Sequence, residues 1–150
     1  MNNRQIKFKF WDKDNKEWIS GSEIEFQENG EPFDLYEKNI IYLQFTGLLD
    51  KNGKEIYEGD ILLLPDEYTE SILDYGQGPI EPCNHISEIV FNIKEGAFGV
   101  KITDKANFIK NGFNSFSKLL YDMGNEYLNK ECLIIGNIFE NFELLNKKDD

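Results

Sequence analysis

The sequence has few of the residues that most often carry metal or thiol chemistry. It contains two cysteines, Cys83 and Cys132, and one histidine, His85. A structural zinc site needs four nitrogen or sulfur ligands, commonly arranged as two close pairs, so these scattered residues cannot build one without carboxylates. Two cysteines in a chain of 150 residues are most simply reduced thiols of a cytoplasmic protein. We therefore predict no metal site.

Positive charge and long apolar runs are also scarce. Lys plus Arg number 16 against 28 Asp plus Glu, which gives a net charge of −12, and Arg4 is the sole arginine. DNA, RNA and anionic lipid would repel such a chain. No apolar run approaches the roughly 18 residues of a membrane span, and the N-terminus lacks the apolar stretch of a signal peptide. We predict a cytoplasmic protein that contacts neither nucleic acid nor membrane directly.

Recognisable catalytic motifs are absent from the sequence as well. The chain has no Walker loop, no GxSxG and no HExxH. The triplet Cys83-Asn84-His85 places a thiol beside a base, but its flanking Pro82 and Asn84 are typical of a loop, which favours an ordinary loop thiol. We predict a non-enzymatic protein with no catalytic residues and no cofactor.

Apolar and aromatic residues are present in the amounts that a folded core requires. Hydrophobic residues make up 40% of the chain and aromatics 14%, which a disordered acidic chain would lack. The segment 6–10 alternates in the pattern of a half-buried strand, and 17–19 resumes this pattern after a polar turn. Asp12 and Asp14 could begin a calcium loop, but Lys16 stands where an oxygen ligand is needed, so a turn is the better interpretation.

Further strands and one helix follow from the pattern. Strands are predicted over 40–45, 61–64, 89–93, 98–102 and 133–135. A helix capped by Asn114 or Ser115 would place Phe116, Leu119, Leu120, Met123 and Tyr127 on one face. The predicted fold class is β-rich α+β, a small barrel-like antiparallel sheet of hairpins with one or two short helices, in a single domain over 1–150.

The region 65–88 has no clear period and holds three of the four prolines, so we predict a mobile acidic loop there. Nine acids and no Lys or Arg lie between Lys54 and Lys94. An acidic surface of this kind suits a basic partner. The predicted partner-binding residues are Glu58, Asp60, Asp66, Glu67, Glu70 and Asp74. A cation site built from Glu55, Glu58 and Asp60 is weaker, because alternation places some of them on opposite strand faces.

Three motifs resemble those of one family. They are IKFKFWD at 6–12, QFTGL followed by DKNGKEIYEGDI over 44–61, and IGNIFEN followed by ELL over 135–145. In this order they resemble the YopX-like family of phage and prophage proteins. Phe142 stands where the family commonly has proline. The resemblance implies a small β-rich protein carried by phages of Gram-positive bacteria or by prophages, without an established biochemical role. The predicted cytoplasm is then that of the bacterial host. The motifs also carry glycines at strand junctions, such as Gly53, and these specify turns.

We therefore expect a phage or prophage accessory protein that binds a host or phage protein, such as a basic nucleic-acid-binding one, through its acidic surface. The charge could instead serve solubility alone. The alternative function is an oligomeric module for a small anionic or nucleotide-like molecule, suggested by Lys94, Lys101, Lys105 and Lys110 near Phe98 and Phe108. Edge strands, 21 aromatics and opposite charges on 55–93 and 94–118 predict a homo-oligomer.

Overall fold

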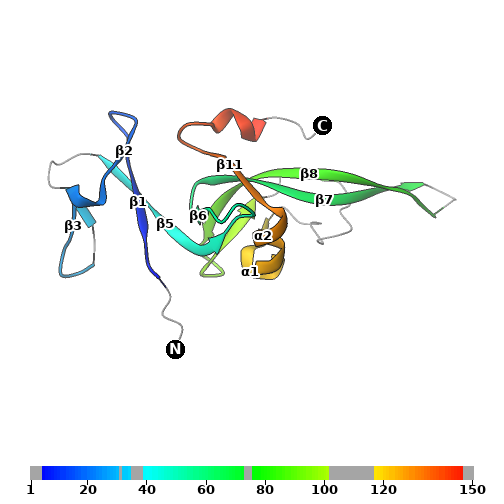
Figure 1. Ribbon diagram of the computed structural model, residues 1–150, viewed down its shortest axis with the longest axis horizontal. Helices are drawn as coiled ribbons and strands as arrows, with labels where there is room; N and C mark the ends of the chain where they lie inside the picture. The colour runs from blue at the N-terminus through cyan, green and yellow to red at the C-terminus, as the bar shows by residue number, and fades with distance from the viewer. Residues whose placement is uncertain (1–4, 31, 35–38, 73–75, 102–116, 147–150) are drawn as a thin grey trace.

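A long antiparallel strand pair runs through the molecule, and the other elements are arranged around one end of it (Figure 1). β7 (Asp60–Ile72) pairs with β8 (Gly76–Asn92). The structure is a computed structural model, and it describes residues 5–30, 32–34, 39–72, 76–101 and 117–146.

β7 and β8 lie inside a five-stranded antiparallel sheet with the order β10-β9-β8-β7-β11. β9 (Ala97–Lys101) pairs with the C-terminal end of β8, and β10 (Ser117–Leu119) pairs with β9. On the other side, β11 (Leu133–Asn137) pairs with the N-terminal end of β7, so both neighbours attach at the same end of the long pair.

A four-stranded antiparallel sheet with the order β2-β1-β5-β6 forms the N-terminal part. Its strands are β1 (Phe8–Asp12), β2 (Glu17–Ile19), β5 (Ile40–Leu49) and β6 (Glu55–Tyr57). β2 and β5 contain the predicted strands 17–19 and 40–45, whereas β1 overlaps the predicted strand 6–10 but begins and ends two residues later. The pattern located these strands because alternation marks strands with one buried face.

The polar turn between β1 and β2 is closed by a side chain. Asp12 is buried, and its Oδ1 accepts hydrogen bonds from the backbone N–H groups of Asp14 (2.9 Å) and Asn15 (3.1 Å). The Asn15 side chain donates a further bond to Asp12 Oδ2 at 2.7 Å. The turn interpretation is therefore confirmed, since Asp12 caps the backbone of the turn.

A small two-stranded sheet of β3 (Ile24–Phe26) and β4 (Pro32–Asp34) follows a short 3-10 helix, η1 (Gly21–Glu23). The weak sequence pattern in this region did not predict these strands. Ile24 nevertheless packs with Phe10 and Ile19 in a minor core.

The predicted amphipathic helix is shorter than expected and broken. Residues 114–116 lie outside the described residues, and 117–119 belong to β10. The helical residues form α1 (Leu120–Met123) and α2 (Asn125–Glu131), separated by Gly124 at φ +86°. An L side chain rarely adopts this angle, so the glycine permits the break.

The main core lies where the five-stranded sheet meets the end of β5, β6 and the two helices. Its buried members are Ile56, Leu62, Leu64, Ile89, Phe98, Val100, Leu120, Tyr127, Leu128 and Cys132. The last short element is the 3-10 helix η2 (Phe142–Asn146). The predicted fold class is confirmed: a β-rich α+β protein whose antiparallel sheet curls into a half-barrel, with short helices.

The loop prediction for 65–88 is wrong. The segment continues β7 and begins β8, with Asp66 opposite Cys83 and Thr69 opposite Ile80. Prolines and glycines hid these strands from pattern analysis, because they interrupt alternation without preventing the pairing of a two-stranded ribbon, whose outer edges need no sheet partner. Residues 73–75, between the two strands, lie outside the described residues.

Candidate functional site

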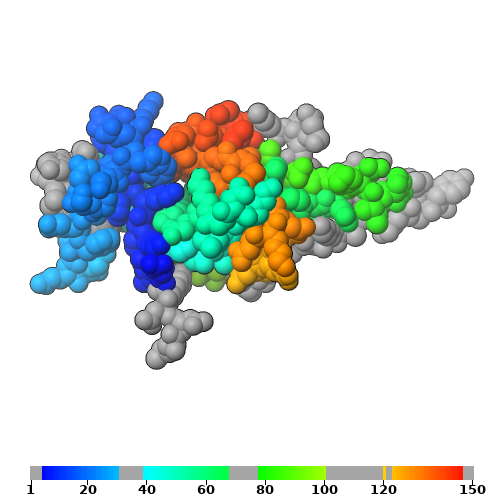
Figure 2. Space-filling view, viewed as in Figure 1, coloured from blue at the N-terminus to red at the C-terminus, as the bar shows by residue number. Residues whose placement is uncertain are grey.

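The long strand pair extends beyond the sheet as a two-stranded projection. Within the described residues, β11 pairs with β7 only up to Leu63, and β9 pairs with β8 only from Ile89. We call residues 64–72 and 76–88 the arm. Figures 1 and 2 show it projecting from the body of the molecule, with its green strands leading to the far end. The arm is therefore the most prominent candidate for contact with a partner.

Charge on this part of the chain is of one sign. Residues 64–88 carry six acids and no Lys or Arg. Four consecutive residues of β8, at positions 79–82, are exposed, and among them Ile80 is 59% exposed. Since neighbouring residues of a strand point to opposite faces, both faces of the arm are exposed there.

The six predicted partner-binding residues do not form one surface. Asp60 and Asp66 are buried, which corrects the prediction for these two, and Glu58 and Glu67 are half-buried. Glu70 lies in β7 where the register with β8 shifts, and its side chain is outside the described set, as is all of Asp74. Glu81, which was not among the predicted residues, is exposed.

Asp66 lies at the base of the arm in contact with the single histidine. His85 Nε2 is 3.0 Å from Asp66 Oδ2, and both side chains are almost fully buried. Asp66 Oδ1 also accepts a hydrogen bond from the backbone N–H of Glu67 at 2.8 Å. This carboxylate thus holds the two strands together inside the protein. It is not available to a partner.

Tyr127 and Cys132 are two further buried polar groups beside the arm. The Tyr127 hydroxyl donates a hydrogen bond to the Pro65 carbonyl at 2.7 Å, which joins α2 to the arm. Burial raises the pKa of Tyr127, and burial likewise raises the pKa of Cys132 to about 12. A buried thiol with such a pKa is a poor nucleophile. Neither Cys132 nor Cys83, which lies in β8 and not in a loop, forms a disulfide.

The acids near β6 are engaged with the protein itself. Glu55 Oε1 lies 2.5 Å from Lys7 Nζ, and the Tyr57 hydroxyl donates to Glu55 Oε2 at 2.7 Å. The hydrogen bond from Lys7, followed by that from Tyr57, lowers the pKa of Glu55, while burial and then the bond to Glu55 raise the pKa of Tyr57 to about 12. Asp60 Oδ2 accepts a bond from the Tyr57 backbone N–H at 2.8 Å.

The motif residues around Asp50 and Gly136 also serve the backbone. Buried Asp50 accepts hydrogen bonds through Oδ1 from the N–H groups of Asn52 and Lys54, and through Oδ2 from that of Ile134. A Cβ on Gly136 would stand 2.6 Å from Asn141 Oδ1, so this position requires glycine. These contacts support the interpretation that the motifs specify structure.

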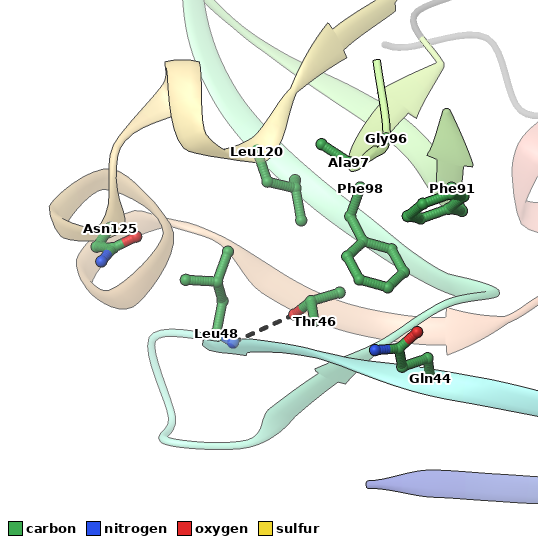
Figure 3. A pocket seen from close by; sticks show the side chains of 9 residues that line it. All are labelled: Gln44, Thr46, Leu48, Phe91, Gly96, Ala97, Phe98, Leu120 and Asn125. Atoms are coloured by element: carbon green, nitrogen blue, oxygen red, sulfur yellow. Dashed lines mark hydrogen bonds between the residues drawn. The ribbon is translucent and has the colours of Figure 1, made fainter. Parts of the chain in front are cut away.

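A pocket of about 450 Å³ lies between β5 and the β8–β9 end of the larger sheet (Figure 3). Phe98 and Leu120 project into it from one wall, and Leu48 and Thr46 line the opposite wall, while Gln44 and Asn125 lie at its two ends. The sequence alone did not indicate this pocket, because β5 and β9 come from distant parts of the chain. The alternation of Phe98 with Val100 was its only sequence signal.

The basic stretch proposed for an anionic ligand is only partly described. Lys94 is exposed, and the side chain of Lys101 is not described. Lys105, Phe108 and Lys110 lie outside the described residues. Phe98, by contrast, is buried and lines the pocket.

The described residues also bear on metal binding and on membrane crossing. No group of three or more His, Cys, Asp or Glu side chains could hold a metal ion within this part of the chain. None of its helices has the length and apolar character needed to cross a membrane.

Fold and site together define a small β-rich α+β protein with a projecting acidic hairpin. The model of the YopX protein family matches residues 7–146, and the chain belongs to this family. The resemblance stated from the motifs is therefore confirmed. None of the curated proteins matches this chain.

Two solved structures are similar to this one. The crystal structure of protein EF1440 from Enterococcus faecalis has a TM-score of 0.50 and 24% identity, over 95% of this chain and 99% of that chain. The crystal structure of protein yopX from Bacillus subtilis has a TM-score of 0.43 and 14% identity, over 92% of this chain and 96% of that one. The first likeness shows that the fold is shared.

The buried contact between Asp66 and His85 predicts a large loss of stability in Asp66→Ala. Removal of one member of a buried polar pair leaves the other in a low-dielectric interior, and we expect the free energy of unfolding to fall by about 2–4 kcal/mol. Urea unfolding measures it. The matched control is Glu67→Ala, next in the chain but half-buried, for which about 0.5 kcal/mol is expected. Equal small losses in both variants would contradict the structural role of Asp66.

For Asp60 we expect the opposite effect: its replacement should raise the stability of the protein, by an amount that depends on pH. Burial raises its pKa, against a smaller lowering by the hydrogen bond from Tyr57. An acid with a raised folded-state pKa contributes stability that is fully present below the unfolded pKa, about 3.9, and is lost as pH rises through the folded pKa. Asp60→Asn carries no charge and keeps an oxygen acceptor, so we expect it to exceed the wild type in stability at pH 7.

Urea unfolding of both proteins at pH 7 and at about pH 4 tests this expectation. The advantage of Asp60→Asn should shrink as the pH is lowered through the pKa of Asp60. Asp14→Asn, at an exposed position, controls for the loss of one negative charge from the whole protein. A variant less stable than the wild type at pH 7 would refute the assignment.

Proposed function

We propose that this protein is a non-enzymatic accessory protein of a phage or prophage, and that it binds a host or phage protein with a basic surface through its arm. The main support for this proposal is the arm itself, a two-stranded acidic projection. The phage or prophage setting comes from the family resemblance.

The energetics of the arm support a binding role. An isolated two-stranded hairpin is at best marginally stable in water, because it has no third strand or helix to cover a face. At the base of the arm, Leu64 and His85 are buried against the body, whereas positions 79–82 are exposed on both faces. A partner that covers Ile80 would bury apolar surface that the arm leaves in water.

Its charge supports a basic partner. Residues 64–88 carry acids and no Lys or Arg, and although Asp66 is buried, Glu81 is exposed and Glu67 and Glu88 are half-buried. Such acids give a negative potential that a positive surface would neutralise. The same potential opposes direct contact with DNA or RNA. A basic nucleic-acid-binding protein is therefore a suitable partner class.

The absence of catalysis is part of the proposal. His85 is 1% exposed and Cys132 is fully buried. Neither side chain can reach a substrate without opening the core, which supports a binding function over catalysis by His85 or Cys132.

Charge reversal on the arm tests the proposal. Glu67→Lys/Glu81→Lys should reduce recovery of the partner from bacterial host lysate at least roughly tenfold, because like charges then meet across the interface. The matched control is Glu25→Lys/Glu28→Lys, at exposed positions near β3. Both variants change the net charge from −12 to −8. Equal recovery with the two variants would refute the role of the arm.

Self-association is a further part of the proposal. Phe26 is 55% and Tyr42 49% exposed, and both lie against Phe8, with ring centroids 6.2 and 6.4 Å apart. Exposed aromatic clusters of this kind often mark interfaces. The acidic segment 55–93 and the basic segment 94–118 would attract each other between copies.

We therefore expect light scattering at micromolar concentration to give a multiple of 17.5 kDa in low salt. High salt should lower this mass, since it screens the attraction between exposed charges. A mass of one chain at both salt concentrations would end the hypothesis of a homo-oligomer.

A further inference from the structure

The pocket of Figure 3 exposes aromatic surface that the fold does not use. Phe91 and Phe98 are cross-strand neighbours on β8 and β9, and their rings meet edge to face, with centroids 5.2 Å apart and an interplanar angle of 75°. Phe98 is buried, but Phe91 is 42% exposed. A planar apolar ligand would gain contact with the exposed part of Phe91 and with Leu48 and Leu120 around it.

The polar groups of the pocket differ in whether the protein already uses them. The Thr46 hydroxyl donates to the Ile56 carbonyl at 2.8 Å and accepts from the Leu48 N–H at 3.2 Å, so it belongs to the local backbone structure. The carboxamides of Gln44 and Asn125 make no side-chain hydrogen bond within the described residues. Each amide therefore offers a ligand one acceptor and two donor hydrogens.

Charge and size narrow the class of ligand further. None of the described lining residues is charged, so these residues supply no counter-charge to an anion. The volume of about 450 Å³ lies within the range of small-molecule sites. An aromatic wall on one side, with amides at the two ends of the pocket, suits a flat, neutral molecule that carries donors and acceptors on its edge.

We propose that this pocket binds an uncharged planar heteroaromatic molecule of the nucleobase or nucleoside type. One face of the ligand would stack on Phe91, and its polar edge would bond to the Gln44 amide, with Asn125 as a second partner. The pocket is lined by residues of β5, β8, β9 and the two helices. The exposed part of the arm, at positions 79–82, is not among these lining residues. This proposal therefore does not depend on the proposed function of the arm.

The test is a titration of the whole chain with adenosine, guanosine, cytidine, uridine and thymidine, followed by ligand-observed NMR and calorimetry. At least one nucleoside should bind with a Kd below about 1 mM. Its affinity should fall at least roughly fivefold in Gln44→Leu, which loses the amide, and in Phe91→Leu, which loses the ring. Asn125→Ala, at an exposed position, should weaken binding without disturbing the core.

Two matched controls apply the same chemical changes elsewhere. Gln27→Leu and Phe142→Leu lie at exposed positions outside the pocket, and both should keep the wild-type affinity. Circular dichroism and the thermal midpoint verify that every variant is folded. Nucleoside 5′-monophosphates distinguish a neutral ligand from an anionic one and should bind no more tightly than the nucleosides.

Three results would overturn the proposal. The first is the absence of nucleoside binding up to about 1 mM, and the second is binding that folded Gln44→Leu, Phe91→Leu and Asn125→Ala leave unchanged. The third is binding of a monophosphate at least roughly tenfold tighter than that of its nucleoside, which would require a positive charge at the site.

Discussion

The antiparallel pairing of β7 with β8 is the interaction on which the rest of the structure depends. At one end, Leu62, Leu64 and Ile89 of this pair form the centre of the main core. The neighbouring strands β9 and β11 attach at this end alone. A slip of one residue would turn the buried side chains to the opposite face. Packing of the core therefore sets the register between β7 and β8, and this register continues from the core into the arm.

Buried carboxylates hold the turns and strands around this pair. Asp50 joins the β5–β6 turn to β11. Asp60 accepts a hydrogen bond from the backbone of β6, and Asp66 of β7 contacts His85 of β8. A buried carboxylate without hydrogen bonds is costly, because it has lost its contacts with water. Each of these carboxylates therefore favours the arrangement of the chain that supplies its hydrogen bonds. Part of the acidic character of this chain is therefore internal structure.

The arm and the pocket differ in the physics that each would use. Exposed acids act over about a Debye length, roughly 10 Å at 0.1 M salt, so the recognition that we propose for the arm would be sensitive to ionic strength. The pocket offers aromatic and amide contacts, which act at short range and respond little to salt. Two such sites could be occupied independently, one by a protein and the other by a small molecule.

The sequence by itself determined the β-rich class, the family and most of the strands of the body. These strands alternate strictly or form short apolar runs, and Asp12 and Gly53 mark their turns. Local pattern is sufficient there because each strand has one buried face. The sequence also showed the acidic character of the region around 65–88, but it did not show that β7 and β8 pair there.

Only the tertiary structure decided which acids are exposed and where a pocket lies. Asp66 and Glu67 are adjacent in the sequence, and nothing local tells that one is buried beside His85 while the other is half-buried. The pocket brings Gln44 together with Phe98, which are far apart along the chain. Burial of this kind depends on which strands pair over long distances, and such pairing follows from packing of the whole core and not from the properties of neighbouring residues.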